Sequence, residues 1–204
     1  MNTIEAIKQR HSCRSYKAKP ISRQTLLDLL ELANFAPSAA NRQNRQFLVV
    51  TSQKDREFLA NMNNQSHLAE APVDVVVFTN PNAFAGPGEY LQAARDWDMH
   101  HWGATERNFK GNKEFLRKYY AMTRTWPISD AAAATENLLL AAAEKGIGSC
   151  WVGVLDDEAI KKRFKIDRSL VTVCVISLGY EKELPKWRTS RKKVKELVRW
   201  GNLK

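Results

Sequence analysis

Three nearly continuous apolar runs constrain the fold of this chain more than any other feature. FLVVT (47–51), VDVVVFT (73–79) and LVTVCVISLGY (170–180) are short and rich in β-branched residues. Such runs are typical of strands covered on both faces, so we expect them in the interior of a sheet. Helical patterns lie between them, which indicates α/β or α+β layering around one sheet. The 204 residues, 44% of them apolar, are enough for one domain with a buried core.

Two helices are predicted before the first of these strands. Asn2 or Thr3 can cap a short helix, and Glu5 is placed as in a capping box. Ser22 can cap a second helix, which Pro37 must end or kink.

The clearest helical pattern lies in the second half of the chain. SDAAAATENLLLAAAEKG (129–146) has Ser129 or Asp130 as its expected cap and Gly146 in the C-terminal stop position. DDEAIKKRF (156–164) is typical of a shorter capped helix. We therefore expect a long helix and a short one on either side of a strand.

The stretch GIGSCWVG (146–153) does not fit a dinucleotide fingerprint. Its third glycine, Gly153, stands where the pattern would need position 151. It also follows a helix and opens a predicted strand, SCWVGV (149–154), whereas a Rossmann fingerprint follows a strand and opens a helix. The sequence contains no G-x-x-x-x-G-K-[ST] motif either, so neither of these nucleotide-binding loops is predicted.

Membrane, secreted and metal-binding classes find no support. The chain has no run of about 18 apolar residues, and its N-terminus, MNTIEAIKQR, is charged where a signal peptide would be apolar. Its three cysteines form no C-x-x-C pair, and the adjacent His100 and His101 cannot chelate one metal at helical i, i+4 spacing. We expect a cytoplasmic protein without a metal site. We expect Cys13 to be a small packing residue; the alternative is a reactive thiol, because Arg14 beside it could lower its pKa.

The net charge of +10 requires nucleic acid to be considered as a partner. Between Lys182 and Lys204 there are nine Lys or Arg residues against two Glu. This basic tail could serve nucleic acid, a phosphorylated ligand or solubility alone. Its apolar residues need a partner surface, which could lie on another subunit: Val194, Leu197, Val198 and Trp200.

Three segments carry a specific combination of polar groups. In RHSCRSY (10–16), the alternating Arg10, Ser12 and Arg14 would face one way in an extended chain and converge on an anion. PSAANRQ (37–43) adds neutral donors and acceptors suited to the edge of a planar heterocycle, namely Ser38, Asn41 and Gln43. The tail adds further cations, Arg188, Arg191 and Lys192.

Together these motifs resemble the FMN-dependent nitroreductase family. The resemblance rests on RHSCRSY, APSAANRQ, ENLLLAAAEKGIGSCWVG and SRKKVKELV, and covers about 1–79 and 129–200. It implies an α+β fold in which helices flank a mixed central sheet, and an intertwined homodimer with two FMN sites at the interface. It also implies a single domain over 1–204, with 80–128 as an insertion on the substrate face and 181–204 as an arm that reaches the partner subunit.

The resemblance further implies the flavin contacts. Arg10 and Ser12 would lie near the ribityl phosphate and Arg14 near the N1/O2 edge, where a cation favours reduced flavin. His11 would also contact the flavin, and Gln65 would contact its pyrimidine edge. The loop with Pro37, Ser38, Asn41 and Gln43 would pack on the flavin of the neighbouring subunit. The strand with Trp151, Val152, Gly153 and Val154 would bring backbone amides to N5 and O4, and Arg191 with Lys192 would bind the phosphate.

The activity implied is hydride transfer from NAD(P)H through flavin N5 to a nitroaromatic, quinone or related small acceptor, in a ping-pong mechanism without a metal, a membrane or nucleic acid. Trp97, Trp102 and Trp126 would lie near the entrance to the flavin site. Two departures stand out, because Arg45 and Gln46 precede Phe47 where the family often has an aromatic residue, and 80–128 matches nothing in the family.

Two alternatives remain open at this point. The same fold could support reductive dehalogenation or flavin fragmentation, and the difference would lie in 80–128. A basic nucleic-acid-binding protein would explain the charge and the aromatic residues, but not Asn41, Gln43 and the glycine-containing strand.

Overall fold

The computed structural model describes residues 2–83, 124–185 and 189–201. Its elements in chain order are α1 (Thr3–Gln9), α2 (Arg23–Asn34), the 3-10 turn η1 (Ala39–Asn41), β1 (Gln46–Val50), α3 (Gln53–Asn63), α4 (His67–Glu70), β2 (Val73–Thr79), α8 (Trp126–Glu144), β3 (Gly148–Val152), α9 (Asp157–Phe164), β4 (Val171–Gly179) and α10 (Val194–Leu197). The three apolar runs are confirmed as strands, whereas α3 and α4 are not among the predicted helices.

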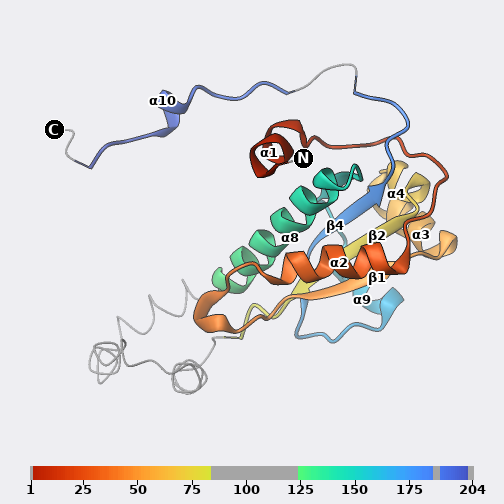
Figure 1. Ribbon diagram of the computed structural model, residues 1–204. Helices are drawn as coiled ribbons and strands as arrows, with labels where there is room; N and C mark the ends of the chain where they lie inside the picture. Colours follow the sequence, from red (N-terminus) through yellow and green to blue (C-terminus); the bar gives the residue numbers. More distant parts are fainter. Residues whose placement is uncertain (1, 84–123, 186–188, 202–204) are drawn as a thin grey trace, which may run out of the picture.

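The described strands form one sheet in the order β1-β2-β4-β3 (Figure 1). Every neighbouring pair in it is antiparallel, so the expected mixed sheet is wrong for these strands. The α3–α4 and α9 connections return the chain to the end of the sheet at which it left, which makes β1–β2 and β3–β4 antiparallel. β2 and β3 run in the same direction, but β4 lies between them. The parallel pairing that the described residues do show is an isolated bridge between Ser12 and Ser149.

Strand position decides how far each apolar run is buried. All seven residues of β2, which lies between β1 and β4, are buried. The expectation that 47–51 lies in the sheet interior is wrong, because β1 pairs only with β2 among the described strands and Val49 is 36% exposed. An apolar run therefore identified a strand here but not its place in the sheet.

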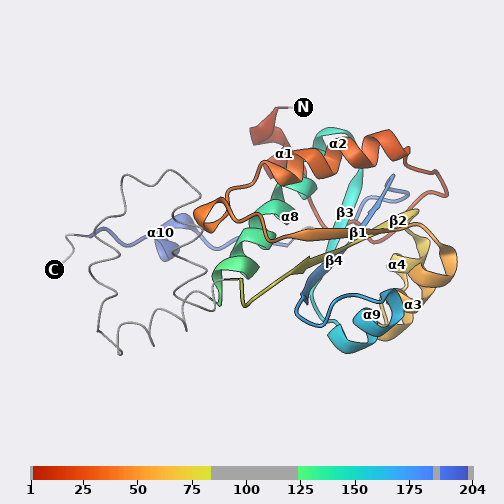
Figure 2. The same ribbon diagram turned by 90° about the horizontal axis from the view of Figure 1, so that it is seen from below.

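Helices cover both faces of the sheet. Figure 2 shows α2 and α8 on one side and α3, α4 and α9 on the other. Because side chains alternate along a strand, β2 supplies both cores. Val75 and Val77 pack in the cluster that contains Leu29 and Leu138, and Val76 packs in the cluster on the opposite face.

Most predicted caps are confirmed. The side chain of Asn2 accepts from the Glu5 N–H while the Glu5 carboxylate accepts from the Asn2 N–H, both at 3.0 Å. The side chains of Ser22 and Asp156 accept from the N–H groups of Thr25 and Ala159 and so cap α2 and α9. Gly146 has φ +68°, a conformation that glycine adopts at little cost and that ends α8.

The start of α8 differs from the prediction. The helix begins at Trp126, with Pro127 in its first turn, so the expected cap at Ser129 or Asp130 is wrong. Proline fits there because first-turn N–H groups have no partner within the helix. Asp130 is instead buried within α8, where it accepts a hydrogen bond from the Ala39 N–H at 3.0 Å.

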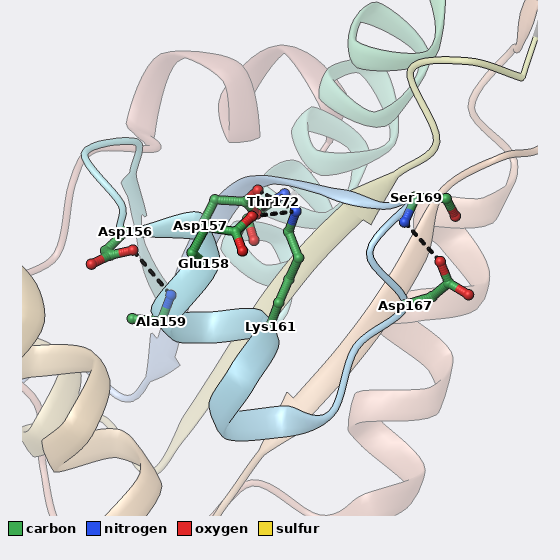
Figure 3. Close-up of polar contacts among 8 residues, drawn as sticks. All are labelled: Asp156, Asp157, Glu158, Ala159, Lys161, Asp167, Ser169 and Thr172. Atoms are coloured by element: carbon green, nitrogen blue, oxygen red, sulfur yellow. Dashed lines mark hydrogen bonds and ion pairs between the residues drawn. The ribbon is translucent and has the colours of Figure 1, made fainter.

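Helix α9 contains a buried lysine that is paired with two more exposed carboxylates. Lys161, only 7% exposed, contacts Asp157 at 2.7 Å and Glu158 at 3.1 Å (Figure 3). Asp157 also accepts from the Thr172 N–H at 2.8 Å, which joins α9 to β4. Burial alone would raise the pKa of Asp157, but the contacts with Lys161 and Thr172 hold it below its ordinary value.

A buried carboxyl in β2 makes the fold sensitive to pH. Both side-chain oxygens of Asp74 lack a hydrogen-bond partner among the described residues, and the side chain is fully buried. Burial raises the pKa of Asp74 to about 8, although the charge of Arg56 opposes the shift. The folded protein thus retains a proton that the unfolded chain releases above the ordinary value of 3.8.

We expect the stabilisation that comes from protonated Asp74 to be complete below pH 3.8 and to be lost as the pH rises toward about 8. Asp74→Asn carries no titrating group, so the fall in unfolding free energy between pH 5 and pH 8 should be smaller than in wild type by more than about 1 kcal/mol. Urea unfolding at both pH values measures this difference. Equal pH dependence in the two proteins would contradict the assignment.

Candidate functional site

The N-terminal segment 10–16 runs along the outer edge of β3. The Cys13 N–H donates to the Ser149 carbonyl at 2.9 Å, beside the parallel bridge of Ser12 with Ser149. Gly148 is required for this close approach, because a Cβ there would lie 2.8 Å from the sulfur of Cys13. The segment is extended along this edge, as predicted, and it leaves Arg14 exposed.

Tyr16 anchors the end of this segment in the sheet. Its hydroxyl contacts the Cys13 carbonyl at 2.8 Å and Ser177 Oγ at 2.7 Å. A Cβ at Gly179 would meet the Tyr16 ring at 2.6 Å, so only glycine permits this packing. The phenol of RHSCRSY is therefore a buried structural group.

A cleft of about 800 Å³ brings together two of the predicted segments. Arg10, His11, Ser12 and Arg14 line it together with Arg191 of the tail. Lys192 is exposed and does not line the cleft. Three arginines and Lys8 face two glutamates there, which gives an excess of positive charge suited to a phosphate ester.

His11 also holds the wall of this cleft together. Its Nε2 lies 2.7 Å from Glu181 Oε1 and its Nδ1 lies 3.0 Å from the Gln9 carbonyl. Both neighbouring oxygens lie within hydrogen-bond distance of the ring nitrogens. His11 thus ties the chain after β4 to the N-terminal segment.

The loop after α2 forms a compact, strained turn. The Gln43 N–H donates to Ser38 Oγ at 3.1 Å, and Gln43 Nε2 donates to Asn41 Oδ1 at 3.2 Å. Asn41 and Gln43 have φ values of +51° and +52°, a left-handed conformation that costs about 1–2 kcal/mol for each residue with a side chain. Such strain persists when surrounding structure imposes it, and it is common at binding sites.

This loop does not share the first cleft. Pro37, Asn41 and Gln43 line a separate hollow of about 410 Å³. The loop lies at the N-terminal end of α8, whereas α1 lies nearer the C-terminal end of that helix (Figure 1). One chain therefore presents the two sets of predicted contacts in different places.

The predicted contacts in and after β3 differ in their exposure. Val152 is buried, whereas Trp151 is 37% exposed, and Gly153 and Val154 are exposed as well. The charges of Arg14 and Arg10 act on Cys150 and oppose the rise in its pKa that burial causes. The end of β3 thus lies close to these two arginines.

Two further predicted residues lie apart from the first cleft. Gln65 is half-buried between α3 and α4, and its N–H donates to the Ala60 carbonyl at 2.9 Å. Trp126 is half-buried at the start of α8. Trp97 and Trp102, and most of the 80–128 segment, lie outside the described residues.

Of the two interpretations of Cys13, the structure supports the packing residue and not the reactive thiol. Cys13 is 1% exposed, and burial raises its pKa to about 11, with Glu181 adding to the rise. The charge of Arg14 acts instead on Cys150 and His67. Neighbours in an extended chain point to opposite sides, so Cys13 faces inward and Arg14 outward.

Sequence reasoning missed two buried charges behind the strained loop, Arg45 and Asp130. Both are less than 10% exposed. Burial lowers the pKa of Arg45 and raises that of Asp130, and the charge of each opposes the shift in the other. The available signals were the unusual arginine before Phe47 and the acid in the alanine-rich helix.

Within the described ranges, no group of three or more His, Cys, Asp or Glu residues could hold a metal ion. None of the helices in that part of the chain has the length and apolar character needed to cross a membrane.

Comparison with known proteins gives the family. The Nitroreductase family model matches residues 7–180. The chain belongs to the Nitroreductase family. A protein from Archaeoglobus fulgidus named "Putative NADH dehydrogenase/NAD(P)H nitroreductase" is 31% identical over 188 residues, which cover 88% of this chain and 86% of that protein.

Solved nitroreductase structures share this fold. The Nitroreductase Family Protein from Streptococcus pneumoniae superposes with a TM-score of 0.74 at 24% identity, covering 98% of this chain and 100% of that chain. A "putative nitroreductase in complex with FMN" from Exiguobacterium sibiricum gives a TM-score of 0.75 at 21% identity, covering 98% and 97%.

All three cysteines of this nitroreductase-family chain are buried, which predicts slow alkylation of the native protein. Burial raises the pKa of Cys13, of Cys150 and, to about 12, of Cys174. We expect iodoacetamide at pH 7.5 to leave the native thiols unmodified and to alkylate all of them in urea, because the thiolate is the nucleophile. Intact-mass spectrometry measures the extent. Rapid native alkylation at Cys13 would contradict its placement.

Proposed function

We propose that this chain is an FMN-dependent oxidoreductase that takes hydride from NAD(P)H and passes it to a nitroaromatic, quinone or related acceptor in a ping-pong cycle. The observation that carries the proposal is the cleft of about 800 Å³ in which Arg10, Ser12 and Arg14 lie with Arg191. Family membership supports it, as do the FMN and NAD(P)H in the names of related proteins.

The residues of the cleft fit FMN. Its volume lies within the range of about 300–1,000 Å³ that small-molecule sites occupy. Its excess of guanidinium groups suits the phosphate, since arginine binds phosphate oxygens through paired N–H donors. Gly153 and Val154, which follow β3, are exposed and offer backbone amides for the flavin ring.

Each group of the chain has a distinct task in the proposed site. FMN, when bound, supplies an acceptor and donor of hydride at N5. Arg10, Ser12 and Arg191 bind the phosphate, and Arg14 places positive charge at the N1/O2 edge, where reduction concentrates negative charge. The amides of β3 orient the ring toward the hydride donor. The protein itself needs no acid or base for the first half-reaction.

We further propose that two chains build each site. The loop with Ser38, Asn41 and Gln43 is in a different place from the arginine-lined cleft of the same chain, so a second copy would supply it. The tail provides apolar side chains for such an interface, because Val194 is 72% exposed and Trp200 is 75% exposed in the single chain. The arm over 181–204 would then reach the partner.

Two arginine variants separate binding from redox tuning. Arg14→Ala should lower the flavin midpoint potential by tens of millivolts, because a charge-assisted hydrogen bond is worth roughly 1.5–3 kcal/mol and 30 mV corresponds to about 1.4 kcal/mol. Arg191→Ala should mainly weaken FMN binding. Spectroelectrochemical titration measures the potential and a fluorescence titration measures FMN binding. Arg14→Lys should shift the potential less than Arg14→Ala, because the charge survives. An unchanged potential in Arg14→Ala would place this residue elsewhere.

Removal of residues 186–204 tests the proposed arm. The shortened chain loses Arg191 from the cleft and the exposed apolar side chains of the tail. We expect it to sediment as a monomer and to retain no flavin after gel filtration. A truncated protein that stays dimeric and yellow would show that the tail serves neither role.

A further inference from the structure

The loop that follows α2 depends on two charges that lie behind it. Its own hydrogen bonds, between Gln43 and Ser38 and between Gln43 and Asn41, are short-range and exposed to water. Exposed bonds of this kind contribute little net stability. They do not by themselves explain why Asn41 and Gln43 both remain in the left-handed region.

Arg45 ties the end of the loop to its beginning. Its Nη2 donates to the carbonyl of Asn34, to Asn34 Oδ1 at 3.1 Å and to the Ala36 carbonyl at 3.1 Å. Asn34 is the last residue of α2, so the guanidinium binds carbonyls at a helix C-terminus, where positive charge is favourable. Residues 35–44 are thereby closed into a loop of fixed ends.

Asp130 holds the middle of the same loop from the opposite side. Its Oδ2 accepts from the N–H of Ala39, the first residue of the η1 turn, at 3.0 Å. Its charge also acts on Arg45. Arg45 therefore holds the start of the loop and Asp130 holds its middle. Ser38, Asn41 and Gln43 belong to the loop that these two contacts hold.

We propose that Arg45 and Asp130 are positioning residues that impose on the 37–43 loop the conformation in which it receives the flavin. This inference rests on the proposed function. It gives a role to the arginine that stands where the family often has an aromatic residue. Arg45 and Asp130, here called the charge clamp, hold the loop by hydrogen bonds and charge, whereas an aromatic side chain could hold it only by packing. In this proposal both residues act on the flavin through the loop that they hold.

The clamp is energetically demanding, which makes it testable. Arg45 Nε and Nη1 are buried and have no hydrogen-bond partner among the described residues. The guanidinium therefore depends on the carbonyls at Asn34 and Ala36 and on the charge of Asp130. Removing one of the two charges leaves the other buried and uncompensated. We therefore expect the effects of the two single substitutions, combined, to exceed the effect of the double substitution.

The experiment titrates flavin-free, full-length protein with FMN and follows flavin fluorescence. Arg45→Met should raise the Kd for FMN at least about tenfold, and Arg45→Lys should lie between it and wild type because charge survives while the fork is lost. Asp130→Asn should have a smaller effect, since an amide oxygen still accepts from Ala39. The double variant Arg45→Met/Asp130→Asn should show less than the product of the two single effects.

Lys161→Met is the matched control. It removes an equally buried cation that is paired with Asp157 and Glu158 in α9, and should lower the urea midpoint while leaving the Kd for FMN unchanged. The visible circular dichroism of bound FMN at saturation should change in Arg45→Met and stay constant in Lys161→Met. A loss of stability alone would move the midpoint in both variants and neither flavin signal.

The outcomes separate the two proposals. If wild type binds FMN and a folded Arg45→Met binds it equally well, the positioning role is overturned and the proposed function stands. If wild type binds no FMN, both are overturned. Should Arg45→Met fail to fold, Arg45→Lys and Asp130→Asn carry the same comparison, and wild-type affinity in both overturns the inference.

Discussion

The antiparallel pairing of β2 with β4 is the constraint on which the rest of the structure depends. Both strands are buried at their centres, and their alternating side chains feed two separate cores. Since helices cover both faces, the polar residues of the candidate site lie at the edges and ends of the sheet. The outer edge of β3 receives the 10–16 segment, and the loop before β1 projects at the end of α2.

Sequence patterns predicted the helices and strands better than the positions of these elements in the fold. The apolar runs identified the strands, and short-range polar signals identified the caps at Asn2, Ser22 and Asp156, because both depend on neighbours in the chain. The edge position of β1 was missed, since strand pairing depends on the whole fold. The start of α8 was missed although Pro127 is a local signal for a first helical turn.

The candidate site shows the same division. Arg10, Ser12 and Arg14 were predicted to face one anion and do line one cleft, joined by Arg191 from the tail. The alternative of a reactive Cys13 fails, because its sequence neighbour Arg14 lies on the other side of the extended chain. Arg45 and Asp130 could not be paired from sequence, since only the folded chain brings residues so distant behind one loop.

The central claim is that each flavin site joins the arginine-lined cleft of one chain to the 37–43 loop of another. The most direct test mixes two inactive proteins, Arg10→Ala/Arg191→Ala and Asn41→Ala/Gln43→Ala, by unfolding and refolding them together. In a mixed dimer, one of the two sites has an unaltered cleft and an unaltered loop, so random pairing should restore about a quarter of the wild-type flavin binding. If the site lay within a single chain, every site would carry a defect, and the refolded mixture would bind no more flavin than its separate components.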